Sequence, residues 1–229
     1  MNIVECIDIK KTYEQGQVEV QALRGISLSI KKGGFVALAG PSGSGKTTIL
    51  NIIGGLDSAD SGTVTVDGNV LDEMNQSQLA DLRLHNIGFV FQAYNLIPVL
   101  SALENVEYVM LLQGVPAADR RQRAKTILDD VGLEDKYGRR PAELSGGQQQ
   151  RVAVARAIVS NPSIVLADEP TANLDSKSGQ DLLKLMQEMN EKKKVTFIFS
   201  THDHMVMDYA RRLVKIRDGR VVDDQIKAR

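Results

Sequence analysis

Residues 40–47 combine three glycines with a lysine and a threonine, in the order Gly-Pro-Ser-Gly-Ser-Gly-Lys-Thr. This order matches the phosphate-loop pattern G-x-x-x-x-G-K-[ST]. Glycine lets the backbone curl until successive N–H groups face a phosphate, while Lys46 would place its charge on the β- and γ-phosphate oxygens and the Thr47 hydroxyl would ligate Mg²⁺. The alternative is a glycine-rich turn without a ligand. Because the loop lies between an apolar run at 35–39 and a helical pattern at 47–53, phosphate binding is favoured.

Two adjacent carboxylates, Asp168 and Glu169, follow the apolar run Ile-Val-Leu-Ala at 164–167. Adjacent residues of a strand point in different directions, so the two acids need not do the same work. Asp168 could hold Mg²⁺ through its water shell, and Glu169 could accept a proton from a water molecule that attacks the γ-phosphate. Alone, this pattern is often only the end of a strand. Downstream of a phosphate loop it predicts a catalytic pair.

A second glycine-containing segment, Leu-Ser-Gly-Gly-Gln-Gln-Gln-Arg at 144–151, precedes an amphipathic stretch at 152–159. Ser145 and Gln148 have the spacing of a capping box, so an ordinary helix start is one interpretation. The two glycines between them would leave the backbone N–H groups bare in front of the helix dipole. The segment therefore predicts a second anion-binding helix start in the same chain.

Four short apolar runs, at 35–39, 87–91, 164–167 and 195–199, are typical of strands buried on both faces of a sheet. Ligands of open parallel sheets bind just beyond the carboxyl ends of the strands. Polar residues follow each run at once: the phosphate loop, Gln92, the pair Asp168 and Glu169, and the segment Ser200-Thr201-His202. We therefore expect these groups to meet at one edge of a parallel sheet.

The rest of the chain divides by its hydrophobic periodicity. Alternation at 4–9 and 18–22 predicts antiparallel strands, and apolar residues between 101 and 160 recur at helical spacing. We expect one α/β domain over residues 1–229, with a P-loop NTPase core and a parallel sheet. This nucleotide-binding core would comprise residues 1–92 and 160–229, with an antiparallel β-subdomain at its N-terminal end and an inserted helical subdomain at 93–159.

Composition excludes several classes of protein. Hydrophobic residues make up 42% of the 229 residues and charged residues 25%, which is ordinary for a globular chain and excludes a disordered one. The net charge of −1 gives no field for nucleic acid or anionic membranes, so we expect no nucleic-acid partner. A single cysteine, Cys6, fits a reducing compartment. The first residues are acidic where a signal peptide would be basic, so we expect a soluble, cytoplasmic chain.

The motifs together resemble those of ABC-transporter nucleotide-binding domains, and the resemblance covers essentially the whole chain. It rests on the phosphate loop, Gln92, the sequence LSGGQ at 144–148, Asp168-Glu169, Asn173-Leu174-Asp175 and His202, which occur in the order seen in that family. The resemblance implies an ATPase in which two copies pack head to tail around two ATP molecules. Each ATP would lie between residues 40–48 of one chain and 145–148 of the other.

The resemblance also implies a role for each site residue. Glu169, His202 and Gln92 would be catalytic, and Thr47, Gln92 and Asp168 would hold Mg²⁺. His202 would contact the γ-phosphate, and Asp175 would cross the dimer interface. Tyr13 would stack on adenine, although it is also a plausible strand residue, and Gln92 is alternatively a polar cap of its strand. The residues expected to bind nucleotide are Tyr13, Gly40, Pro41, Ser42, Gly43, Ser44, Gly45, Lys46, Thr47, Thr48, Ser145, Gly146, Gly147, Gln148 and Asp175.

Residues 91–106 and 144–153 resemble the branch that serves lipoprotein release, macrolide efflux and cell division. That branch implies a separate integral-membrane permease, which would hold the ATPase at the cytoplasmic face of the inner membrane. Residues 107–116 would line the groove for the permease or would form plain helical core. The rival functions are a soluble ABC ATPase without a permease, as in cluster assembly, a small-molecule kinase, and a binding module without catalysis. LSGGQ and His202 have no role in kinase chemistry.

Overall fold

The computed structural model describes residues 1–16 and 18–227 and contains two sheets. The larger has six strands in the order β10-β9-β3-β8-β7-β6. Five of them are parallel, and β10 pairs antiparallel with β9. The strands are β3 (Phe35–Ala39), β6 (Ile87–Val90), β7 (Ile164–Asp168), β8 (Thr196–Thr201), β9 (Arg212–Arg217) and β10 (Arg220–Ile226). The four apolar runs are therefore neighbouring parallel strands, as predicted.

The smaller sheet is antiparallel, in the order β2-β1-β4-β5. Its strands are β1 (Asn2–Gln15), β2 (Val18–Lys31), β4 (Ser61–Val66) and β5 (Asn69–Val70). The sequence predicted shorter strands because β1 and β2 carry register shifts that interrupt their alternation. At one such shift, Asp8 has φ 50° and Gly25 has φ 92°. A Cβ on Gly25 would lie 2.6 Å from Asp8 Oδ1, so this crossing requires glycine.

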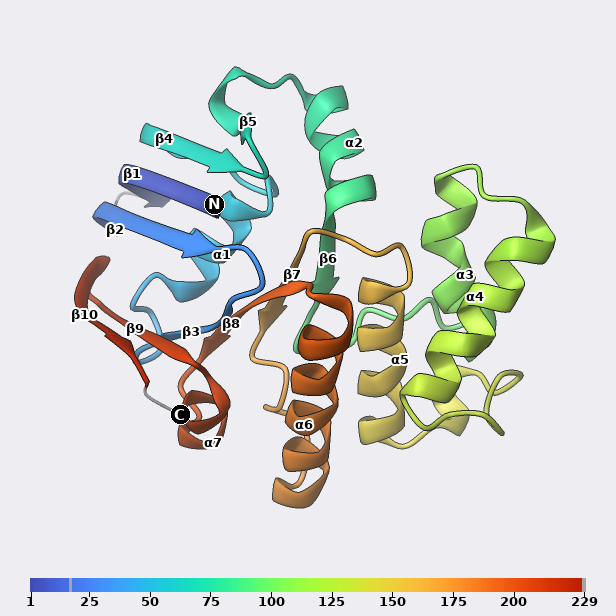
Figure 1. Cartoon of the computed structure of the whole chain (residues 1–229). Helices are drawn as coiled ribbons and strands as arrows, with labels where there is room; N and C mark the ends of the chain where they lie inside the picture. Colours follow the sequence, from blue (N-terminus) through green and yellow to red (C-terminus); the bar gives the residue numbers. More distant parts are fainter. Residues whose placement is uncertain (17, 228–229) are drawn as a thin grey trace.

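Helices lie on both faces of the larger sheet, and a group of helices lies beyond one of its edges (Figure 1). The helices are α1 (Lys46–Ile53), α2 (Gln76–Asn86), α3 (Ala102–Leu112), α4 (Ala117–Asp130), α5 (Gly146–Ile158), α6 (Ser176–Lys193) and α7 (His204–Tyr209), with short 3₁₀ turns at Leu71–Glu73 and Pro141–Glu143. No helix in the described part of the chain is long and apolar enough to span a membrane.

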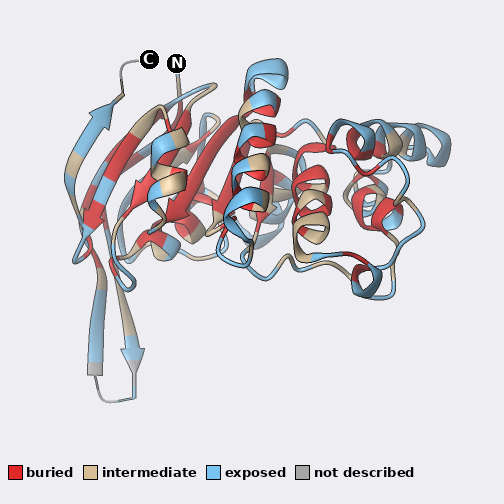
Figure 2. Cartoon of the chain, turned by 90° about the horizontal axis from the view of Figure 1, so that it is seen from below, coloured by how far each residue is buried: buried red, intermediate tan, exposed pale blue. Residues whose placement is uncertain are grey.

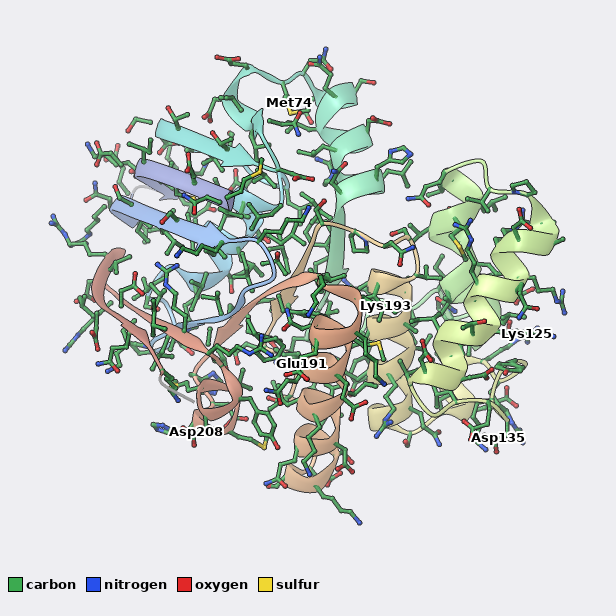
Figure 3. The ribbon with its side chains drawn as sticks, viewed as in Figure 1. Met74, Lys125, Asp135, Glu191, Lys193 and Asp208 are labelled. Carbon is green, nitrogen blue, oxygen red and sulfur yellow. The ribbon has the colours of Figure 1, made fainter. Side chains whose placement is uncertain are left out.

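Alternation along the buried strands divides the core into two layers. On β8, Phe197 and Phe199 pack with the apolar faces of α3–α7, whereas Ile198 packs with α1 and the antiparallel sheet. Figure 2 shows the buried residues concentrated between these layers, and exposed residues on the outer faces of the helices. Charged side chains such as Lys125, Asp135 and Asp208 lie at the periphery (Figure 3).

The predicted helical insertion consists of α3, α4 and α5, which pack on one another. In Figure 1, α3 and α4 lie at the opposite end of the molecule from the antiparallel sheet. The last turn of α5 contacts the larger sheet directly, because a Cβ on Gly88 of β6 would lie 2.2 Å from the Ala157 carbonyl oxygen. The helical unit and the core are thus packed closely at this point. We propose that the helical subdomain spans residues 93–159.

Candidate active site

A pocket of about 570 Å³ opens at the carboxyl ends of β3, β6, β7 and β8, where the sequence predicted a ligand. It brings together the phosphate loop, Gln92, both carboxylates and His202, which lie far apart along the chain. Its lining is Tyr13, Val20, Gln21, Ala22, Arg24, Ser42, Gly43, Gly45, Lys46, Thr47, Thr48, Gln92, Asp168, Glu169, His202, Asp218 and Gly219.

The phosphate loop ends in an uncapped helix start. Gly45 is the N-cap of α1 with φ 101° and makes no side-chain cap hydrogen bond. The first N–H groups of α1 therefore have no acceptor within the helix and are suited to an anion. A Cβ on Gly45 would lie 2.7 Å from the Ala22 carbonyl oxygen, so both the backbone angle and the neighbouring strand require glycine.

Lys46 extends back along this loop. Its Nζ donates hydrogen bonds to the carbonyl oxygens of Gly40, at 2.8 Å, and Pro41, at 2.9 Å. Burial lowers the pKa of Lys46, and the charges of Glu169 and Asp168 act in the opposite direction. The predicted residues Gly40, Pro41 and Ser44 are not among those that line the pocket. They shape the loop, since a Cβ on Gly40 would lie 2.1 Å from the Ile216 carbonyl oxygen.

Asp168 is fixed by two hydroxyl groups. Thr47 Oγ1 lies 3.1 Å from its Oδ1, and Ser200 Oγ also hydrogen-bonds to Oδ1. Parallel pairing of β7 with β8 places Ser200 directly beside Asp168. A carboxylate and a hydroxyl from protein, with the remaining positions left to water and phosphate oxygens, are the donor set that Mg²⁺ prefers in nucleotide sites. Thr47 and Asp168 therefore fit a magnesium ion.

Glu169 leaves the strand in a left-handed conformation with φ 46°, uncommon for a residue with a side chain. Its N–H donates to the Ser200 carbonyl oxygen at 3.0 Å, which holds this turn in place. Its Oε1 lies 2.8 Å from His202 Nδ1. The side chains of Asp168 and Glu169 therefore point in different directions because of this turn, and not because of strand alternation alone. A strained residue fixed on both sides is a feature of functional sites.

The segment after β6 presents Gln92 to the pocket and is held from two sides. Asn173 Nδ2 donates to the Gln92 carbonyl oxygen at 2.8 Å. The Arg156 guanidinium of α5 donates to the carbonyl oxygens of Tyr94 and Asn95, both of which have positive φ angles. Burial lowers the pKa of Arg156. Gln92 is thus connected mechanically to α5 of the helical insertion.

Several pocket residues were missed by sequence reasoning. The turn Asp218–Gly219 forms one wall, and it is joined to the phosphate loop because Gly219 N–H donates to the Ser44 carbonyl oxygen at 3.1 Å. Residues 20–24 of β2 form the adjoining wall beside Tyr13. A turn between two strands near the end of the chain has no motif of its own. Only its paired Asp-Gly, a common hairpin turn, marks it in the sequence.

Residues 145–148 form the predicted helix start at a different place. Ser145 Oγ accepts from Gln148 N–H at 3.3 Å, and Ser145 N–H donates to Gln148 Oε1 at 3.0 Å, which confirms the capping box. The N–H groups of Gly146 and Gly147 have no acceptor within the helix. Among the described residues that line the pocket, none comes from 145–148. One chain therefore carries two separate glycine-containing helix starts, at residues 45–46 and 145–148.

Asp175 likewise lies outside the pocket and serves as the N-cap of α6. Its carboxylate accepts hydrogen bonds from Ser178 Oγ, at 2.6 Å, and from the N–H groups of Lys177 and Ser178. The Ser178 hydroxyl and these N–H groups lower the pKa of Asp175. Its predicted place at a dimer interface remains a proposal, and any such contact would share the carboxylate with this cap.

Comparison with known proteins identifies similar chains. A family model described as "ABC transporter" matches residues 23–172. An uncharacterized ABC transporter ATP-binding protein of Thermotoga maritima is 48% identical over 219 residues, covering 96% of this chain and 93% of that protein. The macrolide export ATP-binding/permease protein MacB of Syntrophobacter fumaroxidans is 49% identical over 221 residues, covering 96% of this chain and 31% of that protein. The chain thus spans about a third of the length of this MacB relative.

The chain is also similar to solved structures of ATP-binding cassettes. A dimeric structure of a post-hydrolysis state of the ATP-binding cassette MJ0796, bound to ADP and Pi, superposes with a TM-score of 0.90 at 42% identity. The match covers 97% of this chain and 98% of that one. The structure of cbiO1 from Clostridium perfringens, part of the ABC transporter complex cbiONQ, gives a TM-score of 0.89 at 30% identity over 98% of this chain and 88% of that one.

Proposed function

Because this chain belongs to the ABC transporter family and is an ATP-binding ATPase of that family, we propose that two copies close around two ATP molecules and drive an integral-membrane permease. The permease would be of the macrolide-export or lipoprotein-release type. The MacB relatives carry ATP-binding and permease parts under one name, and this chain corresponds to about a third of their length. This permease would hold the ATPase at the cytoplasmic face of the membrane.

The observation that carries the dimer is the separation of the two glycine-containing helix starts. The pocket holds the start of α1 with both carboxylates, whereas Gly146 and Gly147 lie outside it. Neither start alone surrounds a triphosphate. A second copy in a twofold arrangement would bring its residues 145–148 over the phosphates bound at residues 40–48 of the first. The cassette MJ0796, which this chain resembles, has a dimeric structure bound to ADP and Pi.

Within this dimer, the phosphate loop binds the β- and γ-phosphates, and Tyr13 contacts the adenine. Thr47, Asp168 and Gln92 would hold Mg²⁺, which would neutralise charge on the phosphate oxygens. Glu169 accepts the proton of the attacking water. His202 Nδ1 lies 2.8 Å from Glu169 Oε1 and, as an N–H donor, orients that carboxylate. The other ring nitrogen then faces the γ-phosphate, and it donates there only when both ring nitrogens carry a proton.

The surface suited to the permease lies on the helical insertion. Tyr108, Leu111 and Leu112 of α3 are spaced to share one helix face and are exposed, Leu112 by 57% of its surface. Val106 and Met110 of the same helix are fully buried. Within residues 107–116, Met110 is therefore helical core, and the exposed Tyr108, Leu111 and Leu112 support the proposed groove. A neighbouring pocket of about 350 Å³, lined by Val109, Phe91 and Arg156 among others, continues this apolar surface toward the Gln92 segment.

We expect Leu112→Glu to prevent association with the permease while leaving ATP binding intact. A charge placed in an apolar interface without a partner costs enough to weaken the complex by about tenfold or more. The measurement is capture of the tagged chain from solubilised native membranes, with quantification of the integral-membrane protein that accompanies it. This capture also tests the proposed function itself, since an ABC ATPase without a permease would bring down none.

The matched control for this variant is Val222→Glu. Val222 is 59% exposed and lies on β10, away from α3. The Val222→Glu substitution adds the same charge to the surface, and this variant should still bind the permease. Equal recovery of the membrane protein with Leu112→Glu and with the wild-type chain would contradict the docking surface.

A further inference from the structure

The last part of β1, which carries Tyr13, has a partner strand on one side only. The pairing of β1 with β4 ends at Lys10 and Ser61, whereas its pairing with β2 continues through Tyr13 and Val20 to the end of the strand. The end of this hairpin projects from the rest of the molecule (Figure 2). A two-stranded ribbon is only marginally stable alone. Something other than the sheet must therefore fix Tyr13 at the nucleotide pocket.

The connection between α1 and β4 supplies the missing contacts. Tyr13 Oη donates to Asp57 Oδ2 at 2.5 Å. One residue earlier on the strand, Thr12 N–H donates to Asp60 Oδ2 at 2.6 Å. Asp60 N–H in turn donates to the Lys10 carbonyl oxygen at 2.9 Å. These bonds occupy the side of β1 that β4 leaves open, so the strand is held along both edges up to Tyr13.

Lys11 joins the two acids. Its Nζ lies 3.1 Å from Asp57 Oδ1 and 3.5 Å from Asp60 Oδ1, and it donates to the Ser58 carbonyl oxygen at 2.8 Å. It also lies 5.3 Å from the centre of the Tyr13 ring. The Lys11 side chain is only 12% exposed, so these contacts are less screened by solvent than ordinary surface ion pairs.

Protonation states favour this arrangement. Burial would raise the pKa of Asp57, but the hydrogen bonds from Tyr13 and Lys11 lower it below its ordinary value. Burial and the hydrogen bond to Asp57 raise the pKa of Tyr13, so the phenol stays neutral and keeps its proton for Asp57. Because its proton is bonded to Asp57, the Tyr13 hydroxyl has none to donate to a base, and the ring is the surface that remains for stacking.

We propose that Asp57 is a positioning residue for nucleotide binding: together with Lys11 and Asp60 it holds the Tyr13 ring where the base of the nucleotide packs. This inference rests on the proposed contact of Tyr13 with adenine. It assigns a role to the α1–β4 connection, which does not itself touch the base. The Tyr13 hydroxyl also hydrogen-bonds to the Thr48 side chain. The backbone N–H groups of the phosphate loop and Lys46, which would bind the phosphates, take no part in the contacts of Asp57, Lys11 and Asp60.

The test compares two ligands, one with the nucleoside and one without it. Calorimetry would give the affinities of Mg²⁺·ADP and Mg²⁺·pyrophosphate for the wild-type chain, Asp57→Ala, Tyr13→Ala and the double variant. Loss of base–aromatic stacking should weaken ADP binding in Tyr13→Ala by about five- to a hundredfold. Asp57→Ala should produce a similar loss. Pyrophosphate binding should change by less than about twofold in either variant, because the phosphate loop is untouched.

The double variant separates positioning from an independent effect. If Asp57 acts through Tyr13, then adding Asp57→Ala to Tyr13→Ala costs no further ADP affinity. Tyr13→Phe removes the hydrogen bond between Tyr13 and Asp57 but keeps the aromatic ring. This variant therefore tests the inference even if Asp57→Ala fails to fold. It should weaken ADP binding in the same direction. Glu14→Gln, an exposed acid next to Tyr13, is the matched control and should bind both ligands as the wild-type chain does.

Three results would overturn the inference: wild-type ADP affinity in Asp57→Ala and Tyr13→Phe, equal losses for ADP and pyrophosphate, or additive losses in the double variant. The proposed contact of Tyr13 with the base fails separately, if Tyr13→Ala binds ADP as tightly as the wild-type chain. The ADP affinity of Tyr13→Ala therefore distinguishes the two failures.

Discussion

Glu169→Gln is expected to slow ATP hydrolysis by about 10²–10⁴-fold, the usual contribution of a general base, while ATP binding is retained. An amide has nearly the shape of the carboxylate but cannot accept the proton of the attacking water. The substitution also keeps a side chain at the left-handed turn, so the backbone is not altered further. Because ATP would bind without being consumed, the variant should accumulate as an ATP-bound dimer on size-exclusion chromatography.

Two quantities are measured: the steady-state rate of phosphate release, and the elution volume on size-exclusion chromatography in the presence of ATP. Glu188→Gln is the matched control, since Glu188 is an exposed acid on α6 that lies outside the pocket. It should turn over at the wild-type rate. If Glu169→Gln did the same, another group would have to serve as the base.

Lys46→Ala is expected to lose most of its affinity for ATP. The Lys46 side chain is almost fully buried, and its ammonium bonds to carbonyl oxygens of the loop that we expect to hold the phosphates. Hydrogen bonds to charged groups contribute about 1.5–3 kcal/mol each, which corresponds to a loss of about ten- to a hundredfold in affinity. The fold should survive, because the Lys46 amine bonds only to loop carbonyl oxygens within its own turn.

Equilibrium binding of ATP and the thermal midpoint of unfolding, measured on the same samples, check this expectation. Lys192→Ala, which removes an exposed lysine from α6, is the control and should change neither quantity. An unchanged dissociation constant for ATP in Lys46→Ala would remove Lys46 from its proposed role. A lowered midpoint without a change in affinity would assign it a structural role instead.

The parts of the site that the sequence predicted are those built from contiguous residues. The phosphate loop, the Asp168–Glu169 pair and the capping box of Ser145 and Gln148 each lie within a few residues, and local backbone geometry largely determines their form. The common edge of the four strands was also predictable. Buried parallel strands place their carboxyl ends together, and each of the four was marked by an apolar run.

The parts that could not be predicted depend on contacts between distant segments. Tyr13 and Asp57 are 44 residues apart, and nothing in either local sequence indicates their hydrogen bond. Ser200 supports Asp168 only because β7 and β8 pair in a register that sequence does not specify. The positive φ of Glu169 is likewise set by its surroundings, since an isolated glutamate would avoid it.

The composite site is tested most directly by the ATPase rate of Ser145→Arg, alone and mixed with Lys46→Ala. Ser145→Arg leaves the phosphate loop of its own chain intact. It puts a bulky side chain where residues 145–148 of one copy would meet the γ-phosphate of the ATP bound by the other copy. Each variant alone should be inactive. In a mixed dimer, one site combines both defects and the other has neither, so mixing should restore part of the wild-type activity. Hydrolysis at the wild-type dimer rate by Ser145→Arg held monomeric by dilution would contradict the account, because each chain would then contain a whole active site.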